Sequence, residues 1–156
     1  MAALPADFPS VRLANLMWLR QPASTDMYAD DVLRHARVVV IEHLGSPSDW
    51  AYVVEQATSL ASRHGQWLAM FSGEQLEDPQ LLLRGTAAVA DSRLLWQCLR
   101  EGGRDNARTF FDLIAHRALG RGALPAPPQP MPAVLRYQPA QPLSWLAQAP
   151  VALLLF

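Results

Sequence analysis

The chain has 156 residues, of which 51% are hydrophobic and 17% are charged, and its formal net charge is −1. This composition is typical of a globular domain and excludes a disordered segment. The balanced charge gives no reason to expect nucleic acid or a membrane surface as a partner. No signal peptide is recognisable, and the apolar run at the end is too short to span a bilayer, so we expect a cytoplasmic protein.

Strand and helix signals alternate along the first part of the chain. Residues 10–15 have the alternation of a short strand, and Ser24 or Thr25 after Pro22 predicts the cap of a helix that continues to about residue 36. The side chains expected to be buried by this helix are Met27 or Tyr28, Val32 and Leu33.

The next two strands are the clearest in the sequence. Four consecutive β-branched residues, Val38–Ile41, predict a strand, and Trp67–Phe71 predicts another. Between them, Ser48 predicts the cap of a helix that ends at Gly65. Strands separated by helices of this length indicate βαβ units, so we expect an open, mostly parallel α/β sheet of the Rossmann or flavodoxin-like type.

Three more helices are predicted as a cluster after the second of these strands. The first runs from Asp78-Pro79 through Leu83, the second from Ala90 or Asp91 through Arg100, and the third from Asp105 through Leu119. Gly102-Gly103 and Gly120 are expected to end the second and the third helix, respectively.

These signals divide the chain into three parts. We predict an α/β domain with its helical cluster at residues 1–122, a proline-rich linker at 123–132, and the beginning of a second, truncated α/β domain at 133–156. Val151–Phe156 is wholly apolar, which is typical of a parallel strand buried on both faces. Such a strand needs a following helix to cover it, so we expect the sequence to be a piece of a longer protein.

One loop lies where open α/β sheets bind ligands. Gly45–Asp49 follows a strand and precedes a helix, so its amides suit a phosphate or a carboxylate. The segment has one glycine and an acidic residue, and matches neither a dinucleotide fingerprint nor a P-loop. A plain strand-to-helix turn is the alternative, and the sequence favours it.

Other candidate residues have structural explanations of equal or greater weight. Glu42, His43 and His64 suit a metal or an acid–base pair, but adjacent strand residues point to opposite faces. His35 and His116 are expected near helix C-termini, where an imidazole is favourable anyway. The remaining candidates are Trp50 and Tyr52 as a stacking surface or packing residues, and Cys98 as a reactive thiol or a buried apolar residue. From residue chemistry we assign no catalytic residue and no metal ligand, and the cofactor-binding residues stay unknown.

A set of short motifs recurs in a familiar order. It comprises Leu13-Ala14-Asn15-Leu16, Pro22 with Ser24-Thr25-Asp26 and Tyr28, Leu44-Gly45 with Trp50 and Tyr52, Gly73-Glu74 with Asp78-Pro79, Leu95-Trp96, Glu101-Gly102-Gly103, and Asp105-Asn106-Ala107-Arg108-Thr109-Phe110. Along nearly its whole length the chain resembles the N-terminal region of the cobaltochelatase large subunit, the CobN family, which is related to the magnesium chelatase large subunit. The stretch from Glu101 to Ala107 is the most specific part.

The resemblance implies a ligase activity that forms nitrogen–metal bonds. The family inserts cobalt(II) into hydrogenobyrinic acid a,c-diamide, with ATP, during aerobic cobalamin biosynthesis. The implied partners are an AAA+ ATPase subunit and its companion, and the full-length protein is expected to hold the corrin. Cobalt and ATP belong to the whole complex, and none is expected on this segment.

The sequence departs from the family at several positions. The family has an earlier strand and helix, and it has His where this chain has Gln21 before Pro22. Glu42 stands where arginine is common, and Ser46 stands where a second glycine is common. The charge reversal at Glu42 argues against transferring a ligand role to the adjacent loop.

Overall fold

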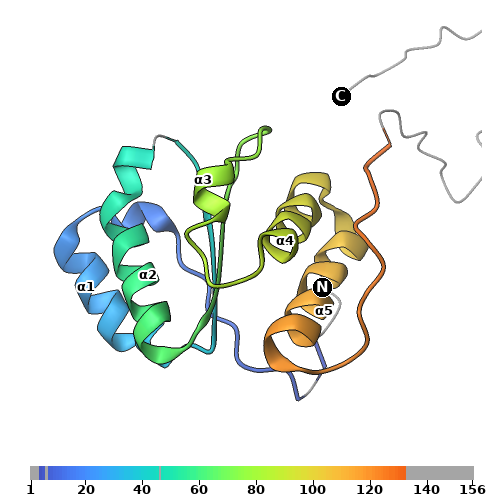
Figure 1. Cartoon of the computed structure of the whole chain (residues 1–156), viewed down its shortest axis with the longest axis horizontal. Coiled ribbons are helices and arrows are strands. Elements are labelled where there is room, and N and C mark those ends of the chain that lie inside the picture. Colours follow the sequence, from blue (N-terminus) through green and yellow to red (C-terminus); the bar gives the residue numbers. More distant parts are fainter. Residues whose placement is uncertain (1–3, 6, 46, 133–156) are drawn as a thin grey trace, which may run out of the picture.

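The structure is a computed structural model that describes residues 4–5, 7–45 and 47–132. Its core is a layer of two strands, with helices α1 and α2 on one side and α4 and α5 on the other (Figure 1). This arrangement confirms the predicted α/β class. The predicted second domain at 133–156, including the strand Val151–Phe156, lies outside the described residues.

The sheet consists of two parallel strands, β1 (Val38–His43) and β2 (Trp67–Ser72). In their register, Val38 lies beside Trp67 and His43 lies beside Ser72. Both strands form where the β-branched and apolar runs predict them. The crossover between them is α2 (Ala51–His64), which ends at Gly65 in the left-handed conformation, as predicted. The helix covers one face of the sheet it connects.

The first hydrophobic cluster lies between the sheet and α2. It contains Val39 and Ile41 of β1, Leu68 and Met70 of β2, and Val54, Ala57 and Ala61 of α2. Small residues on α2 let the helix approach the strands closely, because alanine adds little side-chain volume between the two layers. Val39 and Ile41, which are alternate residues of β1, both point to this face and are buried.

The second hydrophobic cluster lies on the opposite face. Ala69 and Phe71 of β2 pack there against Leu95 and Trp96 of α4 (Val89–Glu101) and against Leu113 and Ile114 of α5 (Gly103–Leu119). Because β2 is buried on both faces, its sequence is a continuous apolar run and not an alternating one. The helical cluster is thus the cover of the sheet's second face.

One edge of the sheet has no strand beside it among the described residues. At the two ends of the ladder, Trp67 N–H donates to Arg37 C=O and Gly73 N–H donates to His43 C=O. The backbone N–H and C=O groups of the odd-numbered residues of β1 therefore point toward β2. Those of Val38, Val40 and Glu42 point to the other side. No described strand pairs with that side of β1.

The predicted strand at residues 10–15 is wrong. The segment has no regular secondary structure, and Leu13 is 92% exposed. It is a connector that runs from α5 to the 3₁₀ helix Leu16–Leu19 (Figure 1). At its α5 end, the ring centroids of Phe8 and Phe111 are 5.8 Å apart. The Asn15 side chain accepts a hydrogen bond from Met17 N–H at 3.0 Å and so caps that 3₁₀ helix.

The first long helix is present, but its cap and its buried face differ from the prediction. Helix α1 (Pro22–Asp31) begins after Gln21 and not at Ser24 or Thr25, because Pro22 occupies the first turn and its φ suits a helix start. The Thr25 hydroxyl is instead buried and donates to Leu19 C=O at 2.7 Å. Met27 is 67% exposed, and the fully buried positions of α1 are Thr25 and Ala29.

Of the other helices, α3 (Pro79–Leu82) starts as predicted, and the starts of α2, α4 and α5 differ from the prediction by one or two residues. Trp50, and not Ser48, precedes α2, because a 3₁₀ turn at Pro47–Trp50 comes first. Asp78 caps the short α3 as predicted. Gly102 ends α4, but Gly103 already begins α5. In the described part of the chain, no helix has both the length and the apolar character that crossing a bilayer requires.

The proline-rich stretch is extended and is held against α5. Asn106 is 6% exposed, and its Nδ2 donates to Gly102 C=O and to Gln129 C=O at 2.8 Å each. Its Oδ1 accepts from Gln129 N–H at 2.8 Å, and Met131 N–H donates to the Glu101 carboxylate at 2.8 Å. One buried amide thus fixes residues 129–131 beside the start of α5.

We expect Asn106→Ala to release this stretch from α5, because three hydrogen bonds of one side chain are lost. The expected cost is about 1–3 kcal/mol of unfolding free energy, since three part-buried hydrogen bonds to the backbone are lost. Hydrogen exchange at the Gln129 amide should accelerate, whereas Arg108→Ala, an exposed position on the same helix, should leave it unchanged. Unaltered protection of Gln129 in Asn106→Ala would contradict the prediction.

Candidate functional site

A shallow hollow of about 530 Å³ opens where the two strands end. Because β1 and β2 are parallel, their carboxyl ends lie side by side, with His43 opposite Ser72. This is the edge at which open α/β sheets bind ligands. The lining residues are His43, Gly45, Ser72, Glu74, Gln75, Leu76 and Asp78.

Two buried polar side chains belong to this lining. His43 is 2% exposed, and its Nδ1 has no hydrogen-bond partner among the described residues. Ser72 is 6% exposed, and its hydroxyl oxygen accepts a hydrogen bond from Glu74 N–H at 3.1 Å. Paired residues of parallel strands point to the same face, so the imidazole and the hydroxyl lie on the same side of the sheet.

The charged part of the lining is acidic. Glu74 and Asp78 contribute carboxylates, and none of the described residues that line the hollow is a lysine or an arginine. One oxygen of Asp78 accepts hydrogen bonds from Gln80 N–H at 3.0 Å and Leu81 N–H at 3.1 Å, which fixes the position of this side chain. The electrostatic potential in the hollow therefore favours cations and hydrogen-bond donors.

The geometry at Gly45 and Asp49 favours the interpretation of this loop as a strand-to-helix turn over its interpretation as an anion-binding site. Gly45 has a φ of 95°, a conformation that glycine adopts without strain. A Cβ on Gly45 would lie 3.6 Å from a carboxylate oxygen of Asp49, so the loop brings negative charge close to its own backbone. This charge opposes a phosphate or carboxylate, and it favours the strand-to-helix turn.

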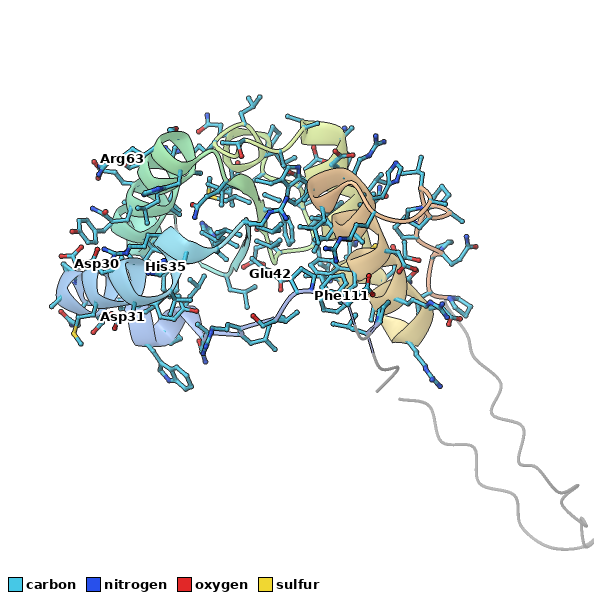
Figure 2. All side chains as sticks on the ribbon, turned by 90° about the horizontal axis from the view of Figure 1, so that it is seen from below. Asp30, Asp31, His35, Glu42, Arg63 and Phe111 are labelled. Carbon is cyan, nitrogen blue, oxygen red and sulfur yellow. The ribbon has the colours of Figure 1, made fainter. Side chains whose placement is uncertain are left out.

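The histidines and Glu42 do not converge. His43 is buried on the α2 face of β1, whereas Glu42 is exposed on the other face, and His64 is exposed at the opposite end of α2. Partial desolvation raises the pKa of Glu42 above its ordinary value. Figure 2 shows Glu42 at the middle of the molecule, apart from His35. Within the described ranges, no three His, Cys, Asp or Glu side chains are arranged to bind a metal ion.

The two aromatic candidates beside the loop have structural contacts. Trp50 is 5% exposed, and its indole N–H donates to Leu44 C=O at 2.7 Å, which ties the loop to the end of β1. Tyr52 donates to the Asp26 carboxylate at 2.6 Å and links α2 to α1. The packing interpretation is therefore confirmed for Trp50, and these two side chains make no common stacking surface.

Cys98 has the buried role predicted for it. The residue is 1% exposed on α4, and burial raises the pKa of its thiol to about 11. A thiol with this pKa is almost wholly protonated at neutral pH, and the protonated form is a poor nucleophile.

We therefore expect the native protein to react with a thiol reagent at pH 8 at least about a hundredfold more slowly than the unfolded chain, because both the thiolate fraction and the access are reduced. With a thiol reagent that releases a chromophore, the absorbance of that chromophore measures the reaction rate of the native protein and of the unfolded chain. The same chain in denaturant is the control, because it carries the same cysteine. Equal rates in the two states would show that Cys98 is accessible.

The sequence interpretation missed the residues that meet at the hollow. The sequence pattern grouped His43 with Glu42 and His64, Glu74 entered only as part of a family motif, and Ser72 was not singled out. The available signal was the position of His43 and Ser72 at the ends of two strands. Parallel strands bring such positions together at one edge, even when the residues are almost thirty positions apart.

Comparison with curated proteins gives two similar sequences of one kind. The chain is 40% identical over 162 aligned positions to the aerobic cobaltochelatase subunit CobN of Pseudomonas aeruginosa, a match that covers 99% of this chain and 13% of the relative. It is 38% identical over 123 positions to the aerobic cobaltochelatase subunit CobN of Sinorhizobium sp., covering 78% of this chain and 10% of the relative. A scan against models of protein families gives no match.

A solved structure agrees with these sequences. The catalytic subunit of cobaltochelatase from Mycobacterium tuberculosis superposes with a TM-score of 0.60 at 29% identity, over 74% of this chain and 10% of that one. The chain spans about an eighth of the length of the P. aeruginosa relative. Sequence and fold together show that the chain belongs to the CobN family of cobaltochelatase subunits.

Proposed function

We propose that this chain is part of a cobaltochelatase large subunit that inserts cobalt(II) into hydrogenobyrinic acid a,c-diamide. The reaction is ATP-dependent and takes place in the cytoplasm during aerobic cobalamin biosynthesis. ATP hydrolysis belongs to an AAA+ ATPase subunit, which acts with a companion subunit. The observation that supports this proposal most strongly is the 40% identity to a CobN subunit over nearly the whole chain.

We further propose that this segment positions the subunit and does not itself carry out chelation. Metal insertion needs bases that remove protons from the ring and ligands that replace the water around the metal ion. Among the described residues, the histidines are dispersed, Cys98 is buried, and no metal-binding cluster is present. We propose that the groups that perform the chemistry lie elsewhere in the full-length subunit.

A docking role is supported by two surface features. Leu13 and Trp18 are 92% and 73% exposed, which is unusual for large apolar side chains close together in the sequence. The outer edge of β1 also presents backbone N–H and C=O groups that no described strand pairs with. Exposed strand edges readily accept a further strand. Both features suit contact with other parts of the subunit or with the partner subunits.

Two assays test these proposals separately. In the first, this chain replaces the matching segment of P. aeruginosa CobN, and cobalt insertion is measured with the partner subunits, ATP and the corrin substrate. We expect the chimera to retain insertion, whereas deletion of the segment should abolish it. A folded chimera that inserts no cobalt would contradict the assignment to a chelatase.

In the second assay, the isolated chain replaces CobN entirely. We expect no cobalt insertion above that of a mixture without it, because the described residues contain no cluster of side chains that could bind a metal ion. Turnover above this background would refute the positioning role. Pull-down of the partner subunits by the isolated chain, beside titration with the corrin, then separates docking to subunits from binding of the substrate.

A further inference from the structure

The orphaned imidazole of His43 is the starting point. A neutral imidazole has one nitrogen that donates and one that accepts, and a fully covered nitrogen without a partner costs about 1–3 kcal/mol. His43 Nδ1 is such an atom, in a side chain that is 2% exposed and lines the hollow. A buried polar atom without a partner calls for an explanation, and a bound group that supplies the missing partner is one such explanation.

The neighbouring groups define what kind of partner fits. The Ser72 hydroxyl lies on the same face of the sheet, and its oxygen already receives one hydrogen bond from Glu74 N–H. Asp78 lines the hollow with a carboxylate that the start of α3 holds in place. Glu74 adds a second carboxylate. The fixed groups are thus mostly acceptors, and the net charge of the lining is negative.

The hollow also has apolar surface beside its acceptors. Leu76 lines it and is 82% exposed, which leaves a large hydrophobic side chain in contact with water. Methylene groups of a bound molecule would cover this surface. A ligand that combines a cationic N–H group with a short alkyl chain satisfies the acceptors, the charge and the apolar rim at once.

We propose that the hollow at the carboxyl ends of β1 and β2 binds an alkylguanidinium or alkylammonium group, with His43 and Asp78 as its principal partners. The charged N–H groups donate to the His43 imidazole and to the Asp78 carboxylate, and the alkyl chain lies on Leu76. This inference does not depend on the cobaltochelatase assignment. The same chemistry is offered by a free polyamine-like molecule and by an arginine or lysine side chain of another protein segment.

The lining argues against the two other ligand classes considered above. A phosphate or a carboxylate would meet two carboxylates without a compensating lysine or arginine in the lining. A metal ion needs at least three converging ligands, and the described residues do not provide such an arrangement. A donor-rich organic cation is the class that remains.

The test is titration of the chain with agmatine, followed by NMR of the His43 ring nitrogens. We expect saturable shifts of these nitrogens with agmatine and none with inorganic phosphate at the same ionic strength. The blocked arginine N-acetyl-arginine-N-methylamide identifies the source. Binding of both guanidinium probes assigns the site to a protein side chain, whereas binding of agmatine and not of the blocked arginine assigns it to a free small molecule.

Two variants and one control make the test specific. Asp78→Asn removes the charge but keeps an oxygen that caps α3, and it should weaken agmatine binding roughly tenfold. His43→Phe removes the ring nitrogens and should weaken binding to a similar extent, as measured by calorimetry. Asp31→Asn removes one negative charge from α1 (Figure 2), at a residue that does not line the hollow, and should change the affinity less than twofold.

Three outcomes would overturn the proposal. The first is an absence of His43 shifts with agmatine, and the second is a larger response to phosphate. The third is equal weakening by Asp78→Asn and Asp31→Asn, which would indicate general attraction between charges and not a site. Since the wild-type titration and Asp78→Asn do not depend on the folding of His43→Phe, the test stands even if that variant unfolds.

Discussion

Replacing Phe71 with alanine is expected to lower the unfolding free energy by about 3–5 kcal/mol. Phe71 is 1% exposed on β2 and packs among Leu82, Leu95 and Leu113 of three different helices. Its removal leaves a cavity between the sheet and these helices, and the surrounding structure relaxes only partly into it. Because domains of this size are stable by only about 5–15 kcal/mol, the variant should be close to its folding limit.

Urea unfolding followed by tryptophan fluorescence measures this loss, and Phe111→Ala is the matched control. Phe111 is half-buried on α5, where its ring contacts those of Phe8 and Phe110 at centroid distances of 5.8 and 5.4 Å. Figure 2 labels it on α5. We expect Phe111→Ala to lower the unfolding free energy by about 1–2 kcal/mol, because Phe111 is less buried than Phe71 and makes two ring contacts. Equal losses would mean that the second hydrophobic cluster does not depend on Phe71.

Gly85→Ala is the second substitution with a large expected effect. A Cβ at this position would lie 2.4 Å from the backbone oxygen of Leu68, a residue with no exposed surface. That oxygen accepts a hydrogen bond from Ala87 N–H at 2.9 Å, and Leu68 N–H donates to the Thr86 hydroxyl at 2.8 Å. The added methyl group must displace this segment from the edge of β2, at an expected cost of about 2–3 kcal/mol.

The comparison for this prediction is Gly73→Ala. A Cβ there would also be too close to its neighbour, at 2.8 Å, but the neighbour is a terminal carbon of Leu44. Leu44 is 62% exposed and is free to adopt another rotamer, so the expected cost is below about 1 kcal/mol. Thermal unfolding of both variants measures the two losses of stability. If Gly73→Ala loses as much stability as Gly85→Ala, contact with rigid backbone is not what makes position 85 sensitive.

The order of stability losses also bears on the proposed function. The residues with large effects, Phe71 and Gly85, lie on or beside β2, which is buried on both faces. Asp78, one of the two residues proposed as principal ligand partners, lies outside this packing, at the start of α3. Substitutions such as Asp78→Asn therefore test binding without removing the packing that holds the strands together.

The sequence by itself determined the kinds of elements and the family. The β-branched run at Val38–Ile41, the glycine stops at Gly65 and Gly120, and the cap at Asp78 appear in the structure as predicted. These signals are local, because each arises from the conformational preference of one residue or of its immediate neighbours. The motif order that resembles the CobN family is likewise a property of the linear sequence, and the similar proteins confirm it.

Tertiary structure decided how those elements are used. Residues 10–15 have the alternation of a strand, yet they cross from α5 to the first 3₁₀ helix because no described strand is placed to pair with them. His43, Ser72 and Asp78 are separated in sequence, and the parallel register and α3 bring them to one hollow. Pairing and packing between distant segments depend on the whole fold, so no local pattern contains them.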